Sequence, residues 1–261
     1  MKDYLGLHLR DLPYFRALLR AVEARFYEGI SLPEPVLDLG CGDGHFASLA
    51  FDRPLFMGLD PWWGPIQEAA ERGSYRHLVC GTGDQMPYPS NYFASAISNS
   101  VLEHIPDLDP VLAETARVLQ PGAPFIFCVP NHRFLDTLSI GRLLDRPGIS
   151  GLSRAYKGFF NRISRHHTCE SHESWEKRLA GFGFEIVKWW DYFPPPALHV
   201  LEWGHFFGIP SWVSKRLFDR WVLVPSRWNL ALADRLTRPH YLREPKSPLG
   251  VYTFYITKLI S

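Results

Sequence analysis

The sequence predicts an α/β fold with a mostly parallel sheet of seven strands, of which the last runs antiparallel. A buried strand and a glycine turn open the pattern at residues 35–44. Apolar runs then alternate with helical segments over residues 35–131, as expected for parallel strands joined by crossover helices. Runs at 184–187 and 251–257 supply the last two strands, and the second of these alternates between apolar and polar residues.

The composition indicates a globular protein without a global attraction to nucleic acid. Hydrophobic residues make up 46% and charged residues 21% of the 261 positions, and the net charge is +1. No apolar run reaches the length of a membrane span, and the N-terminus lacks the apolar core of a signal peptide. We therefore expect a cytoplasmic protein with no nucleic-acid partner and no transmembrane segment.

The cysteines give no indication of a metal site. Cys41, Cys80, Cys128 and Cys169 are far apart and form no C-x-x-C pair. Cysteines in or beside strands are typical of reduced thiols in the cytosol. We expect no bound metal.

The chain is expected to be a single domain of residues 1–261 with added segments. Residues 1–34 form an N-terminal helical segment and residues 35–131 the ligand-binding core. Residues 132–170 contain glycines and basic residues and are interpreted as a lid or substrate segment. Residues 191–249 form a helical cap where a short hairpin loop is the usual connection.

The glycine turn predicts a binding site for a ligand with cationic groups. Gly40, Gly42 and Gly44 allow a sharp turn and a close approach of ligand to backbone. A dinucleotide fingerprint would place its third glycine one residue later. Asp38 and Asp43 also put negative charge where a pyrophosphate would lie, so a nicotinamide dinucleotide is disfavoured.

The stretch Val36–Ala47 closely resembles the first motif of the class I S-adenosylmethionine-dependent methyltransferases. Their cofactor carries a sulfonium and an ammonium group and no phosphate. Asn99–Ile105 resembles the family's stretch after the fourth strand, and Gly181–Phe184 resembles its turn before the sixth strand. The resemblance is strong over the first half of the chain and implies a Rossmann-like sheet. The broad group that this half resembles includes the ubiquinone- and menaquinone-pathway methyltransferases.

The resemblance implies that S-adenosyl-L-methionine is the cofactor and S-adenosyl-L-homocysteine the product. Asp60, twenty residues after Gly40, would accept hydrogen bonds from the ribose hydroxyls. The resemblance also implies cofactor contacts from the glycine turn, from residues beside the adenine of the cofactor and from residues beside its methionine end. The predicted cofactor residues are Asp38, Gly40, Cys41, Gly42, Gly44, Asp60, Pro61, Trp62, Asp84, Gln85, Asn99 and Ser100.

The predicted activity is methyl transfer to a small-molecule acceptor, with O- or N-methylation favoured over C-methylation. A hydroxyl acceptor needs a base, and a near-neutral histidine suits that role. In the family a histidine just before the helix that precedes the sixth strand often reaches the acceptor. The candidates are therefore His167 first, His166 second and then His104, each with a structural role as the alternative.

Other functions stay open at this point. The acceptor could be a protein or a lipid-linked molecule, or the chain could be a non-catalytic module that binds S-adenosylmethionine. A local basic patch is the feature that favours an acidic acceptor, and it consists of Arg142, Arg146, Arg154, Lys157, Arg162 and Arg165. The acceptor, the methylated atom and the oligomeric state are not predicted.

The cap between the last two strands is rich in aromatic residues. We expect helices over 197–207 and 211–236, with most of the aromatic side chains packing the cap onto the sheet. The alternatives are that they hold an apolar acceptor or make peripheral contact with a membrane. The aromatic residues are Trp203, Phe206, Phe207, Trp212, Phe218, Trp221 and Trp228.

Overall fold

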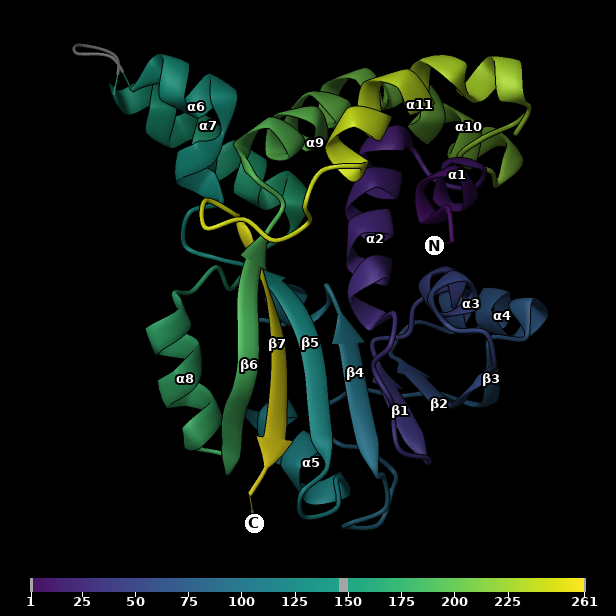
Figure 1. Cartoon of the computed structure of the whole chain (residues 1–261), viewed down its shortest axis with the longest axis vertical. Helices are drawn as coiled ribbons and strands as arrows, with labels where there is room; N and C mark the ends of the chain where they lie inside the picture. The colour runs from purple at the N-terminus through teal and green to yellow at the C-terminus, as the bar shows by residue number, and fades with distance from the viewer. Residues whose placement is uncertain (1, 146–149, 261) are drawn as a thin grey trace.

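The computed structural model describes residues 2–145 and 150–260 and contains a seven-stranded sheet (Figure 1). The strand order is β3-β2-β1-β4-β5-β7-β6, and β7 runs antiparallel between β5 and β6. The predicted fold is therefore confirmed. The strands are β1 (Val36–Leu39), β2 (Leu55–Asp60), β3 (Tyr75–Cys80), β4 (Ser95–Asn99), β5 (Pro124–Pro130), β6 (Phe184–Tyr192) and β7 (Tyr252–Leu259).

Helices cover both faces of this sheet because its central strands are apolar on both sides. Val36 belongs to one buried cluster, while Leu37 and Leu39 belong to the other. The first cluster includes residues of α1 (Tyr4–Leu9), α2 (Tyr14–Tyr27), α3 (His45–Ala50) and α4 (Trp63–Arg72). The second includes residues of α5 (Asp109–Val118) and α8 (His172–Ala180).

The remaining helices lie beyond the carboxyl ends of β1 and β4 (Figure 1). Because the strand order reverses between these strands, the crevice outside their carboxyl ends is the expected ligand site. The elements there are η1 (Leu102–His104), η2 (Leu135–Thr137), α6 (Ser139–Leu144), α7 (Ser150–Ser164), α9 (Pro195–Phe207), α10 (Ile209–Phe218) and α11 (Arg227–Tyr241).

The cap differs from expectation in two ways. The predicted helix over 211–236 is two helices, since α10 stops before Asp219, whose φ of 55° is left-handed. The expectation that most cap aromatics pack onto the sheet is wrong, because Trp203, Trp212 and Trp228 are 43%, 58% and 77% exposed. The inward faces of α9 and α11 use smaller side chains, such as Leu198 and Ala233.

The cap leaves and rejoins the sheet at one point. β6 extends to Tyr192, which pairs with Tyr252 at the start of β7. Gly250 lies so close to Tyr192 that a Cβ atom at Gly250 would fall 2.4 Å from the Tyr192 backbone. None of the described helices combines the length and the apolar character that a bilayer crossing requires.

Candidate functional site

The glycine turn after β1 presents open backbone to the crevice. Gly40, Gly42 and Gly44 have left-handed φ values of 76°, 55° and 70°. A Cβ atom at Gly40 would lie 2.3 Å from Val101, whereas one at Gly42 would meet nothing within 4 Å. Gly40 is therefore needed for packing against the segment after β4. Gly42 leaves a surface that a ligand can approach.

Asp60 ties this turn to the end of β2. Its carboxylate oxygens accept hydrogen bonds from the backbone N–H of Gly42 at 2.9 Å and of Trp62 at 3.0 Å. A carboxylate oxygen has two lone pairs, so each can still accept a bond from a ligand hydroxyl. Pro61 and Trp62 form an exposed surface beside it, with Trp62 70% exposed.

Asp38 lies deeper than the turn. Its carboxylate accepts a 2.6 Å hydrogen bond from the Tyr75 hydroxyl, and burial raises its pKa to about 7. The adjacent Cys41 is also buried, and burial raises the pKa of its thiol. Asp84 and Gln85 remain exposed in the loop after β3. Of the predicted cofactor residues, those of this loop and the middle glycine of the turn thus face open space, whereas Asp38 and Cys41 are buried.

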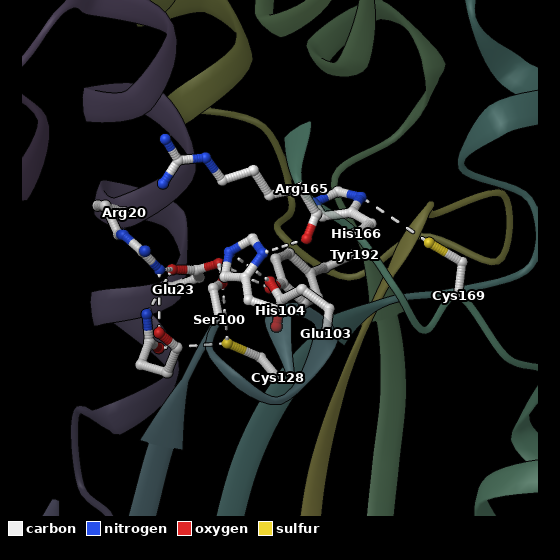
Figure 2. Close-up of polar contacts among 11 residues, drawn as sticks. Arg20, Glu23, Ser100, Glu103, His104, Cys128, Arg165, His166, Cys169 and Tyr192 are labelled. Atoms are coloured by element: carbon white, nitrogen blue, oxygen red, sulfur yellow. Dashed lines mark hydrogen bonds and ion pairs between the residues drawn. The ribbon is translucent and has the colours of Figure 1, made fainter. Parts of the chain in front are cut away.

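The side chains of Asn99 and Ser100 are held by a carboxylate from the N-terminal segment. Glu23 of α2 is fully buried and accepts hydrogen bonds from Asn99 at 2.7 Å, Ser100 at 2.8 Å and Tyr192 at 2.9 Å. Arg20 completes the set at 2.8 Å (Figure 2). The sequence analysis did not identify Glu23, because helical spacing alone placed it off the apolar face.

A cavity of about 1280 Å³ lies next to this cluster, between α2, η1, the segment after α7 and the cap. A volume of this size exceeds the roughly 300–1,000 Å³ of a typical ligand pocket. All three predicted histidines, His104, His166 and His167, line it, although His104 lies some sixty residues before the other two in the chain. Among the predicted cofactor residues, Trp62 and Ser100 line it. The cavity thus borders the predicted cofactor site at Trp62 and Ser100.

His104 lines this cavity, and its Nε2 atom lies 3.9 Å from a carboxylate oxygen of Glu103, beyond hydrogen-bond distance. Its Nδ1 lies 3.0 Å from the backbone carbonyl oxygen of Arg165 (Figure 2). A carbonyl oxygen only accepts, so Nδ1 carries the hydrogen and Nε2 of the neutral ring does not. Desolvation and the nearby positive charges of Arg20, Arg16 and Arg165 lower the pKa of His104. The ring is therefore a neutral proton acceptor at pH 7.

Glu103 and His166 stand beside that ring. Glu103 is 1% exposed, no described residue hydrogen-bonds its Oε2, and burial raises its pKa to about 8. The ring of His166 is buried against Phe134, and desolvation lowers its pKa to about 3. Its Nδ1 lies 3.8 Å from the sulfur of Cys169 (Figure 2). Both groups are thus neutral at pH 7 in the free protein.

Glu103, His104 and His166 bring potential ligand atoms within 4.8 Å of one another, a grouping that the sequence analysis did not foresee. Such oxygen and nitrogen atoms could coordinate a divalent cation. However, Arg16, Arg20 and Arg165 act on His104 with positive charge, and the same field opposes a cation. The arginines therefore make this cluster unfavourable for a divalent cation.

Four arginines give the cavity a positive field: Arg16, Arg20, Arg162 and Arg165. Arg20 is compensated by Glu23, but Arg16 has no described carboxylate partner and lies 5.5 Å from the Trp221 ring. Desolvation and the like charge of Arg20 lower the pKa of Arg16 to about 10. Arg146 of the predicted basic patch lies outside the described residues. The cavity can therefore attract an anionic group.

A family model described as a methyltransferase domain matches residues 37–127, from β1 into β5. Those residues form a class I S-adenosylmethionine-dependent methyltransferase domain. The matched segment contains the glycine turn, Asp60 and the stretch after β4. The cofactor of such domains is S-adenosylmethionine, and the residues around Gly42 fit it.

Characterised relatives resemble this methyltransferase domain over part of their length. The chain is 33% identical over 95 residues to malonyl-[acyl-carrier protein] O-methyltransferase of Serratia marcescens, covering 36% of this chain and 37% of the relative. It is 27% identical over 169 residues to the enzyme of that name from a Methylovorus species, covering 51% and 57%. The chain thus spans less than two thirds of the relatives it matches.

Solved structures share the fold along nearly the whole chain. A possible histamine N-methyltransferase from Thermotoga maritima has a TM-score of 0.58 at 17% identity, covering 95% of this chain and 91% of that one. Geranyl diphosphate C-methyltransferase from Streptomyces coelicolor, solved with Mg²⁺, geranyl-S-thiolodiphosphate and S-adenosyl-L-homocysteine, has a TM-score of 0.53 at 14% identity, covering 91% of this chain and 75% of that one. At these identities the likeness supports the fold.

Proposed function

We propose that the methyltransferase domain transfers a methyl group from S-adenosylmethionine to an oxygen or nitrogen of a small acceptor bound in the cavity. The observation that supports this proposal is the Nε2 atom of His104 in η1, which makes no hydrogen bond among the described residues while Nδ1 is held by Arg165. The nearest carboxylate oxygen, from Glu103, lies 3.9 Å from Nε2. Bound S-adenosylmethionine supplies an electrophilic methyl carbon on a sulfonium. The protein contributes to catalysis by aligning the acceptor with that carbon and by excluding water from the site.

The proton balance assigns a role to His104. As the acceptor oxygen forms its bond to the methyl carbon, the sulfur–methyl bond breaks and the acceptor proton moves to Nε2. The lowered pKa of His104 keeps that nitrogen free at pH 7. His167, the first candidate from the sequence, also lines the cavity, but no described contact fixes the tautomer of its ring. We therefore assign the base to His104.

The cofactor would lie along the turn and reach the cavity with its methyl group. The ribose hydroxyls would bind Asp60, the adenine would lie near Trp62, Asp84 and Gln85, and the methionine end would face Asp38. The open surface at Gly42 supports this placement, because a side chain there would fill it. Asn99 and Ser100 would act through their backbone, since their side chains bind Glu23.

The acceptor would combine an anionic group with an apolar part. Arg16 and Arg165 offer cavity-lining guanidinium groups, and the rings of Phe15, Trp212 and Trp221 line the remaining wall. Planar guanidinium groups bind carboxylate and phosphate in bidentate fashion. A small amphiphilic acid therefore suits the cavity better than a neutral polar molecule.

A second candidate is a malonyl-like carboxylate as the methylated group, which the names of the two curated relatives suggest. A carboxylate acceptor is already ionised at pH 7 and needs no base. Dependence of turnover on His104 therefore separates a hydroxyl acceptor from a carboxylate acceptor.

Calorimetric titration tests the cofactor half of the proposal. We expect micromolar binding of S-adenosylmethionine and S-adenosylhomocysteine, no binding of NAD, and loss of both affinities in Asp60→Ala. Asp52→Ala is the matched control, because the Asp52 side chain is 94% exposed and its carboxylate contacts Lys2 rather than the glycine turn. Binding of NAD, or unchanged affinity in Asp60→Ala with both variants folded, would refute the assigned site.

Methyl transfer itself is measured with S-adenosylmethionine labelled in its methyl group. The labelled cofactor is incubated with the protein and with hydroxylated carboxylic acids of increasing apolar length. We expect label in the organic phase only with the protein present, and a higher kcat/KM for the longer acids. Cofactor binding without transfer to any of these acids would favour the non-catalytic alternative.

A further inference from the structure

The cap exposes an unusual amount of apolar surface. Of 23 large hydrophobic side chains that are exposed among the described residues, 13 belong to residues 203–249. Single exposed apolar residues are normal, but a concentration of this kind marks an interaction site. They are Trp203, Phe207, Trp212, Val213, Leu217, Phe218, Leu223, Val224, Trp228, Leu232, Leu236, Leu242 and Leu249.

Helix α11 is apolar on two opposite faces. Leu230, Ala233 and Tyr241 pack inward against the core. On the other side Trp228 and Leu232, four residues apart, are 77% and 68% exposed. A helix that only covers a core needs one apolar face, with polar residues opposite it. The outer face of α11 is therefore suited to bind an apolar surface outside this chain.

The cap also concentrates the positive charge of the chain. Residues 209–249 contain eight Lys and Arg against three Asp and Glu, a net charge of +5 in a chain whose total is +1. Asp219 and Asp234 are already paired with Lys215 and Arg238. Exposed arginines without a described carboxylate partner flank the apolar side chains: Arg216, Arg220, Arg227 and Arg235.

Aromatic and aliphatic side chains mixed with unpaired arginines suit the interface of an anionic bilayer. A second copy of the chain suits this surface less well, because a two-fold interface would place one +5 surface against another. The described helices are too short and polar to cross a membrane, so contact would be parallel to its plane.

We propose that α10, α11 and the loop between them dock on an anionic phospholipid surface. Figure 1 shows these helices at the end of the molecule that lies beyond the carboxyl ends of the parallel strands. Trp212 and Trp221 belong to this region and also line the cavity. Docking therefore places the cavity next to the lipid, and, on the proposed function, gives an amphiphilic acceptor a route from the bilayer.

Vesicle flotation of the full chain tests the docking. We expect the wild type to float with phosphatidylcholine vesicles that contain phosphatidylglycerol and to bind pure phosphatidylcholine at least about tenfold more weakly. The double variant Trp228→Gln with Leu232→Gln should lose about tenfold or more in partitioning, because it removes the inserted apolar groups without adding charge. Arg227→Gln with Arg235→Gln should lose the preference for the anionic lipid.

Two controls separate docking from misfolding and from nonspecific adhesion of exposed apolar side chains. Val187→Gln alters an apolar side chain of β6 that is 62% exposed, and it should float like the wild type. Unchanged S-adenosylhomocysteine affinity in both cap variants shows that the fold and the cofactor site are intact, independently of docking. Wild type that stays with neither vesicle overturns the proposal. So does a wild-type dimer that Trp228→Gln with Leu232→Gln converts to monomer.

Discussion

The Nδ1 atom of His104 lies 3.0 Å from the backbone carbonyl oxygen of Arg165, and this contact joins η1, the short helix after β4, to the segment after α7. This contact fixes the tautomer of the ring. The backbone N–H of His167 donates to the carbonyl oxygen of Glu103 at 2.7 Å and holds the same two segments together. The proposed base is thus oriented by a part of the chain some sixty residues away.

His104→Ala is expected to lower kcat for a hydroxyl acceptor by about 100-fold or more, the usual worth of a general base. Affinity for S-adenosylhomocysteine should stay within about twofold, because the ring lies beyond the cofactor site. In the wild type kcat should fall only below the pKa of His104, which lies under 6.5, and this acid limb should vanish in the variant. A larger loss in His167→Ala than in His104→Ala would contradict the assignment.

Gly42→Ala is expected to weaken S-adenosylmethionine binding by about tenfold or more while the protein stays folded. Its φ of 55° costs an alanine about 1 kcal/mol, and its Cβ would occupy the open surface of the turn. Gly29→Ala is the matched control, since Gly29 has a φ of 77°, and its Cβ also meets nothing. Calorimetry should find full affinity in Gly29→Ala, and equal losses in both variants would argue against the placement.

Glu23→Ala is expected to lower the free energy of unfolding by about 3–5 kcal/mol. It leaves the buried donors of Asn99, Ser100 and Tyr192 without their acceptor and Arg20 without its counter-charge. Urea titration followed by circular dichroism measures the change. Glu71→Ala, at an exposed position of α4, should stay within about 0.5 kcal/mol. A small effect of Glu23→Ala would show that water replaces the carboxylate.

Asp38→Asn is expected to stabilise the free protein in a pH-dependent way. Burial raises the pKa of Asp38 to about 7, so the wild type loses stability as pH rises from the unfolded pKa of 3.8 through that value. The variant's advantage in free energy of unfolding should grow by up to about 1.4 kcal/mol per pH unit over this window and level off above it. Denaturation at several pH values measures it.

Asp52→Asn, at a side chain that is 94% exposed, should give a flat difference over the same pH range. A flat difference for Asp38→Asn as well would mean that Asp38 remains ionised in the folded state. Asp38→Asn should also bind S-adenosylmethionine less tightly than the wild type, because the substitution removes a negative charge near the proposed position of the methionine end.

The sequence predicted those parts of the structure that depend on local patterns. The glycine turn, Asp60 at the end of β2 and the succession of strands and helices along the chain follow from apolar patterns, turns and their spacing, which neighbouring residues determine. Glu23 could not be predicted in this way. Its partners come from β4 and β6, and a glutamate on a helix is normally solvated. The predicted roles of the cofactor and catalytic residues stay predictions.

The cap was misjudged for a related reason. Periodicity identified apolar helices, but it does not distinguish a face that packs on the protein from one that packs on something else. Leu230 and Leu232 differ by two positions in α11, and the structure places the first against the core and the second outside. Likewise, no local pattern could show that His104 and His166 line one cavity.

The cap departs from Tyr192 and returns at Tyr252, which are neighbours in the sheet. Any connection that spans those two residues therefore closes the same β6–β7 hairpin, whatever its length. Replacing this segment would change the part of the cavity wall that the cap supplies and the proposed docking face together, while residues 35–131 would keep their contacts with one another. Selectivity for acceptors can thus diversify, in evolution or by design, without rebuilding the catalytic scaffold.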